Sequence, residues 1–369
     1  MILNNTFQGK SMNEKKKVAI IFGGCSPEYK VSLASAYSII CHMDRTRYEL
    51  VLVGISPAGA WYQFDGDLEK ISLDTWCNDK DCTPVTIFPE RGSYSLLLLG
   101  EDRVERQNID VVFPVLHGRN GEDGTVQGLF ELFNIPAAGC GILSSALCMD
   151  KERAHRMVRA AGISVPESFC IGLNTDRAKV RAQAEIIGYP LFVKPMRAGS
   201  SYGVAKVFHE VELLAAIDTA FLYDENIIVE QNIPGFEVGC AIIGNEELTM
   251  GEIDEIELSE GFFDYEEKYT LKNSAIHVPA RISEELTQKL KRTAATIYRV
   301  LGCRGFARVD LFLSDTGEIV FNEVNTIPGF TVHSRFPNML KAAGMNFMEV
   351  ISAVIELACE GNGEGHDGH

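Results

Sequence analysis

Two short stretches near the end of the chain constrain its fold more than any other feature, because each reads as a strand with two different faces. They are residues 305–313 and 320–325, and Asp315-Thr316-Gly317 lies between them. Side chains of a strand point alternately to its two faces, so the pattern predicts a β-hairpin with one apolar and one polar face. A two-residue turn, at 315–316 or at 316–317, pairs even-numbered with odd-numbered positions. Either turn brings four side chains to the polar face, namely Arg308, Asp310, Glu323 and Asn325.

The chemistry of that polar face favours a metal site. Two carboxylates and an amide oxygen on a rigid hairpin are hard ligands, which suit Mg²⁺ with water and phosphate completing its coordination. The alternative is an ordinary solvated face of a sheet. The same alternation would flank the arginine and the two acids with Phe306, Phe312 and Phe321, which would be an unusual solvated surface.

The rest of the chain divides into units of mixed helix and strand. Three continuous apolar runs, Val18–Phe22, Leu50–Ile55 and Ile109–Leu116, indicate strands buried on both faces. A helical stripe lies between the first two, and strand–helix–strand order is typical of a parallel α/β sheet. We therefore predict a fold of α/β and α+β units. The predicted parts are an extension or tag (1–14), an N-terminal α/β substrate domain (15–136), a central subdomain (137–232), a C-terminal subdomain with the metal site (233–360) and a flexible tail (361–369).

Composition disfavours several classes of protein. Lys and Arg number 34 against 51 Asp and Glu, and the net charge of −17 opposes binding to nucleic acid. No apolar run approaches the roughly 20 residues that span a bilayer, and residues 1–10 lack the apolar core of a signal peptide. The ten cysteines are scattered and include no C-x-x-C pair, which is typical of a reduced cytosolic protein without structural zinc. We expect a cytoplasmic protein that binds neither nucleic acid nor membrane.

A glycine-rich segment, Lys194–Gly203, lies between two predicted strands. Its glycines allow backbone amides to approach phosphate oxygens, and the hydroxyls of Ser200 and Ser201 add donors. The order differs from the Walker motif, because Lys194 precedes the loop instead of ending it. A flexible connection without a ligand is therefore an equally good interpretation of this segment alone.

Three charged residues outside that loop could complete a nucleotide site. Lys151 opens a predicted helix behind the N-cap Asp150 and could contact phosphate. Glu230, at the end of a predicted strand, and Glu237, seven residues later, could bind an adenine amino group and ribose hydroxyls. Taken singly, each of the three is more often a solvated surface residue.

The first domain carries polar residues where its predicted strands end. Glu28 follows the glycine turn after the first strand, and His117-Gly-Arg119 follows the strand at 109–116. Open α/β sheets bind ligands at the carboxyl ends of their strands. Glu28 could therefore pair with a ligand ammonium, although either segment could equally be an ordinary loop.

Taken together, these segments resemble the D-alanine–D-alanine ligases of the ATP-grasp superfamily. The resemblance covers about residues 17–357. It rests on six motifs: Gly23-Gly-x-Ser-x-Glu28, His117-Gly-Arg-x-Gly-Glu-Asp-Gly124, Met149-Asp-Lys151, Lys194-Pro-x-Arg-x-Gly-Ser-Ser201, Asp264-Tyr-Glu-x-Lys-Tyr269 and Glu323-x-Asn-Thr-x-Pro-Gly329. It implies an ATP-grasp fold with an N-terminal Rossmann-like domain, and a homodimer formed through that domain. It also implies an ATP-dependent ligase of peptidoglycan precursor synthesis with two Mg²⁺ ions, for which Mn²⁺ could substitute.

The resemblance assigns roles to individual residues. ATP would be bound by Lys151, Lys194, Ser200, Ser201, Glu230, Ile233, Glu237, Phe262 and Lys268, and Mg²⁺ by Asp310, Glu323 and Asn325. The first D-alanine would lie near His117 with its ammonium on Glu28, while Ser200 and Tyr269 would join Glu28 in closing a loop over the site. Arg308 and the amide of Gly329 would stabilise the tetrahedral intermediate, and Ser334 would hold the carboxylate of the second substrate.

The implied reaction agrees with the chemistry of these residues. ATP would convert the D-alanine carboxylate to an acyl phosphate, and the amine of the second amino acid would then displace phosphate. Phosphoryl transfer requires mainly positioning and charge neutralisation, which lysines and metal ions supply. Acyl phosphates hydrolyse readily, so a lid that excludes water is expected, and the polar, aromatic segment 261–274 fits that role.

Two substitutions bear on the second substrate. Arg335 stands where D-alanine–D-alanine ligases usually have leucine, and Phe263 stands where they usually have tyrosine. Both resemble the D-alanine–D-serine ligases of vancomycin resistance, most closely the VanG type. Our hypothesis is that Arg335, with Asp254, forms a polar subsite for the serine hydroxyl, because such a site rejects an analogue that lacks the hydroxyl. The alternative is that Arg335 is a cation on the rim and that D-alanine remains the second substrate.

One residue departs from the family pattern. The position two residues after Glu28 is usually acidic, and here it is Lys30. A lysine beside a carboxylate that binds an ammonium would weaken that attraction unless it points away.

Two other classes of protein share parts of this pattern. One is a different ATP-grasp carboxylate–amine ligase, against which the His117-Gly-Arg and Lys268-Tyr269 motifs speak. The other is a non-catalytic nucleotide-binding protein. The intact carboxylates at 310 and 323 speak against it, because such a protein has no need of metal ligands.

Overall fold

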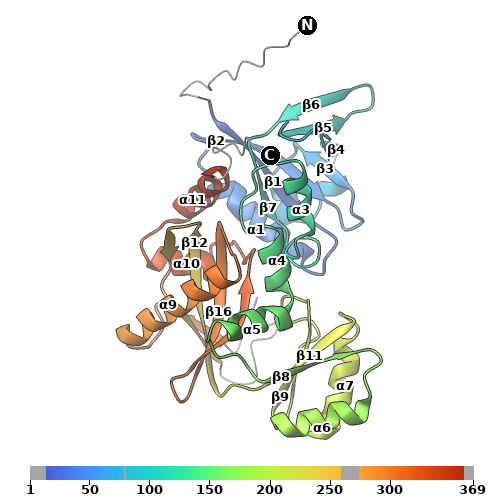
Figure 1. The fold of residues 1–369 in the computed structure, drawn as a ribbon. Helices are drawn as coiled ribbons and strands as arrows, with labels where there is room; N and C mark the ends of the chain where they lie inside the picture. The colour runs from blue at the N-terminus through green and yellow to red at the C-terminus, as the bar shows by residue number, and fades with distance from the viewer. Residues whose placement is uncertain (1–13, 79, 259–273, 361–369) are drawn as a thin grey trace, which may run out of the picture.

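Three β-sheets with helices packed against them follow one another along the chain (Figure 1). The computed structural model describes residues 14–78, 80–258 and 274–360. The fold class predicted from the sequence, α/β and α+β units, is confirmed. Four predicted site residues lie outside the described ranges: Phe262, Phe263, Lys268 and Tyr269. The predicted tail, nearly all of the predicted extension and nearly all of the predicted lid lie outside them too.

The first sheet has seven strands in the order β6-β5-β4-β3-β2-β1-β7. β1 (Lys16–Gly23) runs parallel to both neighbours, β2 (Tyr48–Ile55) and β7 (Val111–Val115), which confirms the predicted parallel unit. The other elements of this domain are β3 (Trp61–Phe64), β4 (Cys82–Ile87), β5 (Ser95–Leu99), β6 (Val104–Asn108), α1 (Tyr29–His42), α2 (Glu69–Ser72), a 3₁₀ turn (Trp76–Asn78) and α3 (Thr125–Leu132). Because β1 and β7 are adjacent and parallel, the segments that follow them meet at one edge of the sheet.

The second sheet has four strands in the order β10-β9-β11-β8. Its elements are β8 (Ser168–Gly172), α6 (Arg177–Ile187), β9 (Leu191–Pro195), β10 (Ala205–Val207), α7 (Glu210–Ala220) and β11 (Asn226–Gln231). Two helices lead into it, α4 (Ile142–Met149) and α5 (Lys151–Ala160). The predicted N-cap is confirmed, because the Asp150 carboxylate accepts a hydrogen bond from the backbone N–H of Arg153 at 3.1 Å. That cap fixes Lys151 at the first position of α5.

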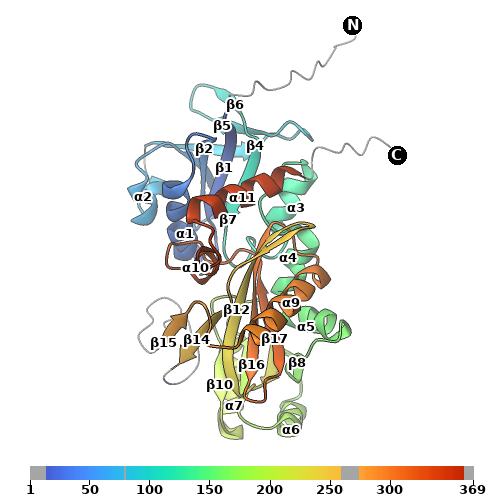
Figure 2. The ribbon, with the colours of Figure 1, turned by 90° about the vertical axis from the view of Figure 1, so that its left-hand side faces the viewer.

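The third sheet carries the predicted hairpin. Its strand order is β15-β14-β12-β16-β17, and β13 pairs with β12. The elements are β12 (Gly235–Gly244), β13 (Leu248–Met250), β14 (Asp254–Leu258), β15 (Ser274–His277), α9 (Glu284–Val300), β16 (Phe306–Ser314), β17 (Ile319–Asn325), α10 (Arg335–Ala342) and α11 (Phe347–Glu360). Figure 2 shows α9 lying along one face of this sheet. The residues of α9 that face the sheet form a core with the apolar side chains of β12, β16 and β17.

The hairpin differs from its prediction in two places that compensate each other. Three residues, 315–317, connect the strands instead of two, since Ser314 pairs with Glu318. That loop alone would turn Glu323 to the face opposite Asp310. A β-bulge leaves Asn322 without a partner in the register and shifts the pairing by one residue. Asp310 therefore lies opposite Glu323, and the two share one face, as predicted.

The bulge also corrects the prediction for Phe321. This ring was expected on the polar face with the acids, yet it pairs with Leu311 and is fully buried in the apolar core. Phe321 and Glu323, which are separated by the bulged residue Asn322, therefore face opposite sides of the sheet. The polar face is less aromatic than the alternation suggested.

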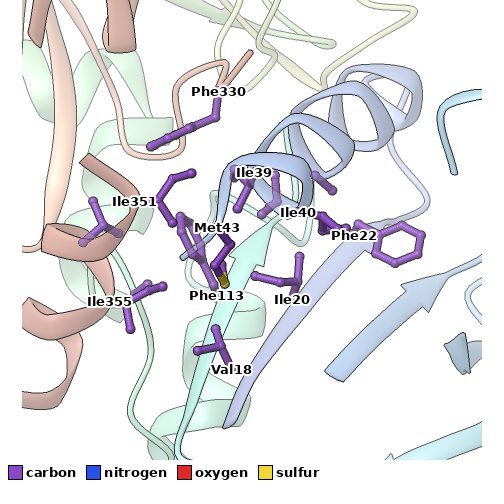
Figure 3. Packing of buried hydrophobic residues seen from close by; sticks show 14 of the residues in the cluster. Val18, Ile20, Phe22, Ile39, Ile40, Met43, Phe113, Phe330, Ile351 and Ile355 are labelled. Atoms are coloured by element: carbon purple, nitrogen blue, oxygen red, sulfur yellow. The ribbon is translucent and has the colours of Figure 1, made fainter. Parts of the chain in front are cut away.

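The last helix, α11, packs against the first sheet (Figure 3). Ile351 and Ile355 lie beside Phe113 of β7 and Met43, which follows α1. Tyr48 donates a hydrogen bond to the Glu356 carboxylate at 2.7 Å on the same side. The sequence had placed this helix with the C-terminal subdomain. The three sheets fall within the three predicted units, but the domain boundaries themselves stay a prediction.

The structure also bears on the apolar runs and on the cysteines of the chain. Within the described ranges no single helix is long and apolar enough to cross a membrane, and α10 and α11 meet that length and composition only as a pair bent by 104°. All ten cysteines are free thiols.

Candidate active site

Two cavities adjoin at the loop after β9, and both are lined by Gly199 and Ser200. The first cavity, of about 340 Å³, is lined by eight predicted site residues: Lys151, Lys194, Ser200, Ser201, Glu230, Ile233, Glu237 and Glu323. The second cavity, of about 440 Å³, is lined by Glu28, His117, Ser200, Arg308, Asn325, Gly329, Ser334 and Arg335. The residues predicted to bind nucleotide and those predicted to bind amino acids thus separate into neighbouring spaces. Asp254 and Asp310 line neither cavity and lie behind the arginines.

Two buried lysines supply positive charge to the first cavity. Lys151 Nζ donates to the carbonyl oxygen of Ala198 at 3.0 Å and lies 3.5 Å from the Glu323 carboxylate. Lys194 Nζ lies 2.5 Å from the Glu230 carboxylate. Burial alone would lower the pKa of Lys194, but the Glu230 carboxylate raises it above its ordinary value, so the lysine stays charged. The cavity can therefore neutralise phosphate oxygens.

Glu230 presents one oxygen that the described residues leave unsatisfied. The carboxyl group is 2% exposed, and its Oε1 accepts no hydrogen bond in the described part of the chain. Burial would raise the pKa of Glu230, but the Lys194 ammonium lowers it overall, so the acid is ionised. A buried, ionised acceptor that lines a cavity requires a donor, and the exocyclic amine of adenine would supply one.

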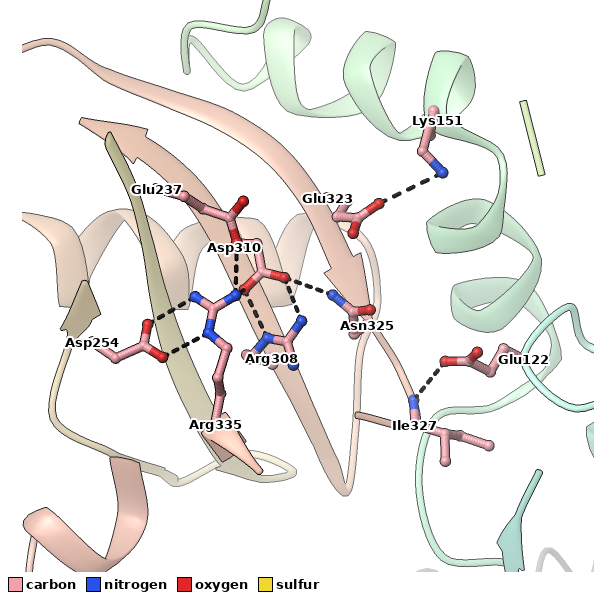
Figure 4. A network of polar contacts seen from close by, with 10 residues as sticks. All are labelled: Glu122, Lys151, Glu237, Asp254, Arg308, Asp310, Glu323, Asn325, Ile327 and Arg335. Carbon is pink, nitrogen blue, oxygen red and sulfur yellow. Dashed lines mark hydrogen bonds and ion pairs between the residues drawn. The ribbon is translucent and has the colours of Figure 1, made fainter. Parts of the chain in front are cut away.

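The polar face of the hairpin is a network of charges (Figure 4). The Asp310 carboxylate accepts hydrogen bonds from Arg308 Nε and Nη2, both at 2.7 Å, and from Asn325 Nδ2 at 2.8 Å. Burial would lower the pKa of Arg308, but Asp310 raises it above its usual value. In this arrangement the negative charge of Asp310 is balanced by Arg308, and that of Glu323 by Lys151.

The donor set of this face fits Mg²⁺. The described residues contain no group of three or more His, Cys, Asp or Glu side chains arranged around a metal ion. The predicted set has only two carboxylates, and Mg²⁺ commonly binds through one or two carboxylates together with phosphate and water. Turning the Asn325 amide would present its oxygen in place of the nitrogen that now faces Asp310. Asp310, Glu323 and Asn325 would thus hold the ion between the two cavities, since Glu323 lines the first and Asn325 the second.

Glu28 lies buried at the junction of the two cavities. Its carboxylate accepts a hydrogen bond from the Ser200 hydroxyl, as two members of the predicted trio should. A Cβ atom at Gly199 would lie 2.8 Å from Glu28 Oε2, so a side chain at this position would displace the carboxylate. The third predicted member, Tyr269, lies outside the described residues.

Glu122 is a site residue for which the sequence predicted no role, although it belongs to the motif at residues 117–124. Its Oε2 accepts from the Gly118 N–H at 2.7 Å and its Oε1 from the Ile327 N–H at 3.2 Å. It therefore ties the N-terminal domain to the loop after β17 (Figure 4). Burial and the nearby Glu28 carboxylate raise the pKa of Glu122 to about 8. The position of Glu122 in the His117 motif was the only sequence signal.

His117 is buried in the second cavity and is neutral at pH 7. Its Nε2 lies 3.3 Å from the Ser35 hydroxyl, and burial lowers its pKa to about 4. A neutral imidazole can line a site for a zwitterionic amino acid without repelling the ammonium group.

The buried state of His117 predicts a pH-dependent stability. Its folded pKa lies below the unfolded value of 6.5, so the unfolded chain binds the extra proton first and stability falls from pH 6.5 to pH 4. The loss attributable to this residue is on the order of 3 kcal/mol. Urea unfolding across this range should show that His117→Asn has lost this part of the acid sensitivity. The exposed His333→Asn should keep it, and parallel curves for wild type and His117→Asn would contradict the assignment.

Arg335 forms the centre of a buried ion-pair network (Figure 4). Its Nε and Nη2 donate to the two oxygens of Asp254 at 2.7 and 2.8 Å, and its Nη1 donates to Glu237 at 2.7 Å. Arg335 is 7% exposed and Asp254 is 0% exposed. The alternative that Arg335 is a rim cation is therefore wrong. Glu237, whose predicted contact with ribose stays a prediction, lines the first cavity and links this network to it.

The Arg335–Asp254 pair lies directly on the backbone of β12. A Cβ atom at Gly239 would lie 2.6 Å from Arg335 Nη2 and 2.8 Å from Asp254 Oδ1. Burial would lower the pKa of Arg335, but Asp254 raises it well above its ordinary value, so the guanidinium is permanently charged. A guanidinium has five N–H donors, and three of them are used in these bonds. Of the other two, one belongs to Nη1, which lies 3.5 Å from Asp310, and one to Nη2; Arg335 also lines the second cavity.

Ser334 and Gly329 both line the second cavity and lie close together. The Ser334 hydroxyl accepts from the Thr331 N–H at 3.0 Å and lies 2.8 Å from the Thr331 hydroxyl. Because Ser334 precedes α10, its hydroxyl is held at the positive end of that helix, where a carboxylate is favoured.

Comparisons with known proteins agree with this geometry. Family models described as "D-ala D-ala ligase N-terminus" and "D-ala D-ala ligase C-terminus" match residues 17–140 and 157–356. The vancomycin B-type resistance protein VanB of Enterococcus faecalis is 47% identical over 94% of this chain and 99% of its own length. A D-alanine–D-alanine ligase of Caldicellulosiruptor bescii is 42% identical over 94% of this chain and 96% of its own.

A solved structure resembles the whole fold. The VanG D-Ala:D-Ser ligase from Enterococcus faecalis is 50% identical, covers 94% of this chain and 100% of its own, and superimposes with a TM-score of 0.86. This match confirms the ATP-grasp fold that the motifs implied. With both family models spanning most of its length, the chain belongs to the D-alanine–D-alanine ligase family.

Proposed function

We propose that this ligase joins D-alanine to D-serine, with ATP as the energy source and D-alanyl phosphate as the intermediate. The observation that carries the proposal is Arg335, which lines the second cavity while Asp254 holds it from behind. A guanidinium with spare donors can hydrogen-bond the serine hydroxyl, and D-alanine would leave those donors unpaired. The similarity to the VanG D-Ala:D-Ser ligase supports the same substrate.

The described side chains divide the work of the reaction. Glu28 binds the ammonium of D-alanine, whose carboxylate then faces the first cavity across Gly199 and Ser200. Lys151 and Lys194 neutralise the phosphates of ATP, whose adenine donates to Glu230. Mg²⁺, when bound, would neutralise charge on the transferred phosphoryl group.

The second half of the reaction uses the opposite end of the second cavity. Ser334 holds the carboxylate of D-serine, and its amine attacks the acyl phosphate. Arg308 and the Gly329 amide, which line this cavity, would stabilise the oxyanion of the tetrahedral intermediate. The lid at 261–274, with Phe262, Phe263, Lys268 and Tyr269, would exclude water, and these residues lie outside or at the edge of the described part.

The proposed product fits a role in resistance to vancomycin. D-alanyl-D-serine would enter peptidoglycan precursors in place of D-alanyl-D-alanine, in the cytoplasm, where ATP and the precursors are available. A homodimer formed through the N-terminal domain, with two Mg²⁺ ions or Mn²⁺ in each subunit, completes the proposal.

One observation favours a second candidate, a ligase that joins two D-alanines. Three of the five Arg335 donors are already bonded to Asp254 and Glu237, so the arginine could serve chiefly to hold those acids. The Caldicellulosiruptor bescii relative carries the name D-alanine–D-alanine ligase. Under this candidate, Arg335 would be structural.

A competition assay separates the two candidates. Purified protein with ATP, Mg²⁺, D-alanine and D-serine at equal concentration should release ADP and form mainly D-alanyl-D-serine, identified by product mass. Mainly D-alanyl-D-alanine would support the second candidate. ADP release that needs neither amino acid, or a product containing another acceptor, would contradict both.

A further inference from the structure

Lys30 stands between the second cavity and the solvent. It is the second residue of α1, it is exposed, and it lines the second cavity together with Glu28 and Ser334. It also lines an adjoining space of about 650 Å³, which we call the outer cavity. The outer and second cavities share Lys30, Ala34 and Thr331.

The outer cavity opens to solvent. Two of its lining residues, Leu73 and Val332, are 68% and 43% exposed. A small molecule passing from this opening toward Ser334 would therefore pass the side chain of Lys30. That route leads to the end of the second cavity where the second amino acid is proposed to bind.

Lys30 differs from the two arginines that line the second cavity. Arg308 is bonded to Asp310, and Arg335 is bonded to Asp254 and Glu237. Lys30 forms no ion pair with any carboxylate in the described ranges. Its charge is thus available to a ligand.

Apart from the N-cap residue Glu28, whose carboxylate accepts a hydrogen bond from Ser200, the start of α1 offers no acidic group that would favour a lysine. The first turn of this helix contains no acidic residue, and its backbone N–H groups already make that end positive. A lysine is unfavourable there, whereas an acidic residue would be favourable. A residue that breaks a local rule without a partner in the fold is a candidate for function.

We propose that Lys30 positions the second amino acid. Its ammonium group attracts the carboxylate of this substrate at the mouth of the second cavity, and the carboxylate then binds to Ser334. The inference rests on the proposed ligase reaction. The amine attacks in its neutral form, so the reactive second substrate carries a net negative charge, which a nearby ammonium favours. The first substrate is bound through its ammonium by Glu28, and there the same lysine is unfavourable.

Lys30 should therefore have opposite effects on the binding of the two substrates, and the two KM values measure them. With D-alanine saturating and D-serine varied, Lys30→Gln should raise the KM for D-serine about threefold, and Lys30→Glu about tenfold. The KM for D-alanine should stay the same or fall in both variants, and kcat should change much less than the KM for D-serine. Raising the salt concentration should raise the KM for D-serine of wild type but not of Lys30→Gln, because an exposed charge is screened.

Two controls exclude a structural explanation. Lys179→Glu makes the same charge reversal on α6, where Lys179 is exposed and lines none of these cavities, and should leave both KM values unchanged. The Tm of Lys30→Glu should equal or exceed that of wild type, since an acid suits the helix start. Equal KM values for D-serine in wild type and both Lys30 variants, or a parallel rise in both KM values, would overturn the inference. Dipeptide formation by wild type is a separate result, and its absence would count against the proposed function.

Discussion

Replacing Asp310 by Asn is expected to lower kcat for ADP formation about a thousandfold or more and to destabilise the fold. The carboxylate is 1% exposed and accepts three hydrogen bonds from Arg308 and Asn325, and a second guanidinium, that of Arg335, lies 3.5 Å away. Asn keeps the shape but removes the negative charge between two buried cations, which costs about 3–5 kcal/mol. ADP release and urea unfolding would measure the two effects.

A second variant separates chemistry from stability. Glu323 is the other predicted carboxylate ligand, but its side chain is 24% exposed and its cation, Lys151, lies 3.5 Å away. Glu323→Gln should therefore reduce turnover as severely while costing about 1 kcal/mol or less of stability. Asp315→Asn, at the exposed tip of the same hairpin, should change neither quantity. Turnover near the wild-type level in Glu323→Gln and Asp310→Asn would refute the assignment of this face as the metal site.

In the hairpin, sequence periodicity predicted the correct face for the polar residues, although it missed the length of the loop and the bulge. Alternation predicted that Asp310 and Glu323 would share one face of the hairpin, and in the structure they are direct partners. The prediction rested on a two-residue turn, whereas the chain has a three-residue loop and a bulge at Asn322. Two changes of one residue cancel in register, so the pairing survives. Periodicity alone carries no information on such a bulge, because its cost and benefit depend on the neighbouring strand.

Long-range packing was the part that the sequence could not supply. The apolar runs predicted β1, β2 and β7, and the cap at Asp150 predicted the start of α5. No local pattern indicated that α11 packs on the first sheet, because its apolar stripe would suit any apolar surface. For Arg335, the family resemblance had suggested Asp254 as a partner, and the two do pair, but nothing in the sequence indicated the second partner, Glu237. The propensities and the spacing of residues in the sequence predict secondary structure and motifs. Ion pairs between distant elements depend on the tertiary fold and are not predicted in this way.

Replacing Arg335 by Leu should shift the second-substrate preference from D-serine toward D-alanine. We expect the ratio of kcat/KM for D-serine to that for D-alanine to fall about a hundredfold, because the serine hydroxyl loses its donor in a buried site. The substitution also leaves the Asp254 carboxylate, which is 0% exposed, without its ion-pair partner, so the single variant should lose about 3–5 kcal/mol of stability. Product masses from competition assays and urea unfolding would measure both.

A double variant keeps this test decisive when the single variant is too unstable. In Arg335→Leu/Asp254→Asn the buried acid is neutral, so stability should largely return while the preference for D-alanine remains. Arg304→Leu, which removes an exposed arginine before β16, should alter neither preference nor stability. Should the double variant fold well and still prefer D-serine as strongly as wild type, the hydroxyl must be recognised elsewhere. Arg335 would then serve only to hold Asp254 and Glu237 against β12, as its three hydrogen bonds to them would allow.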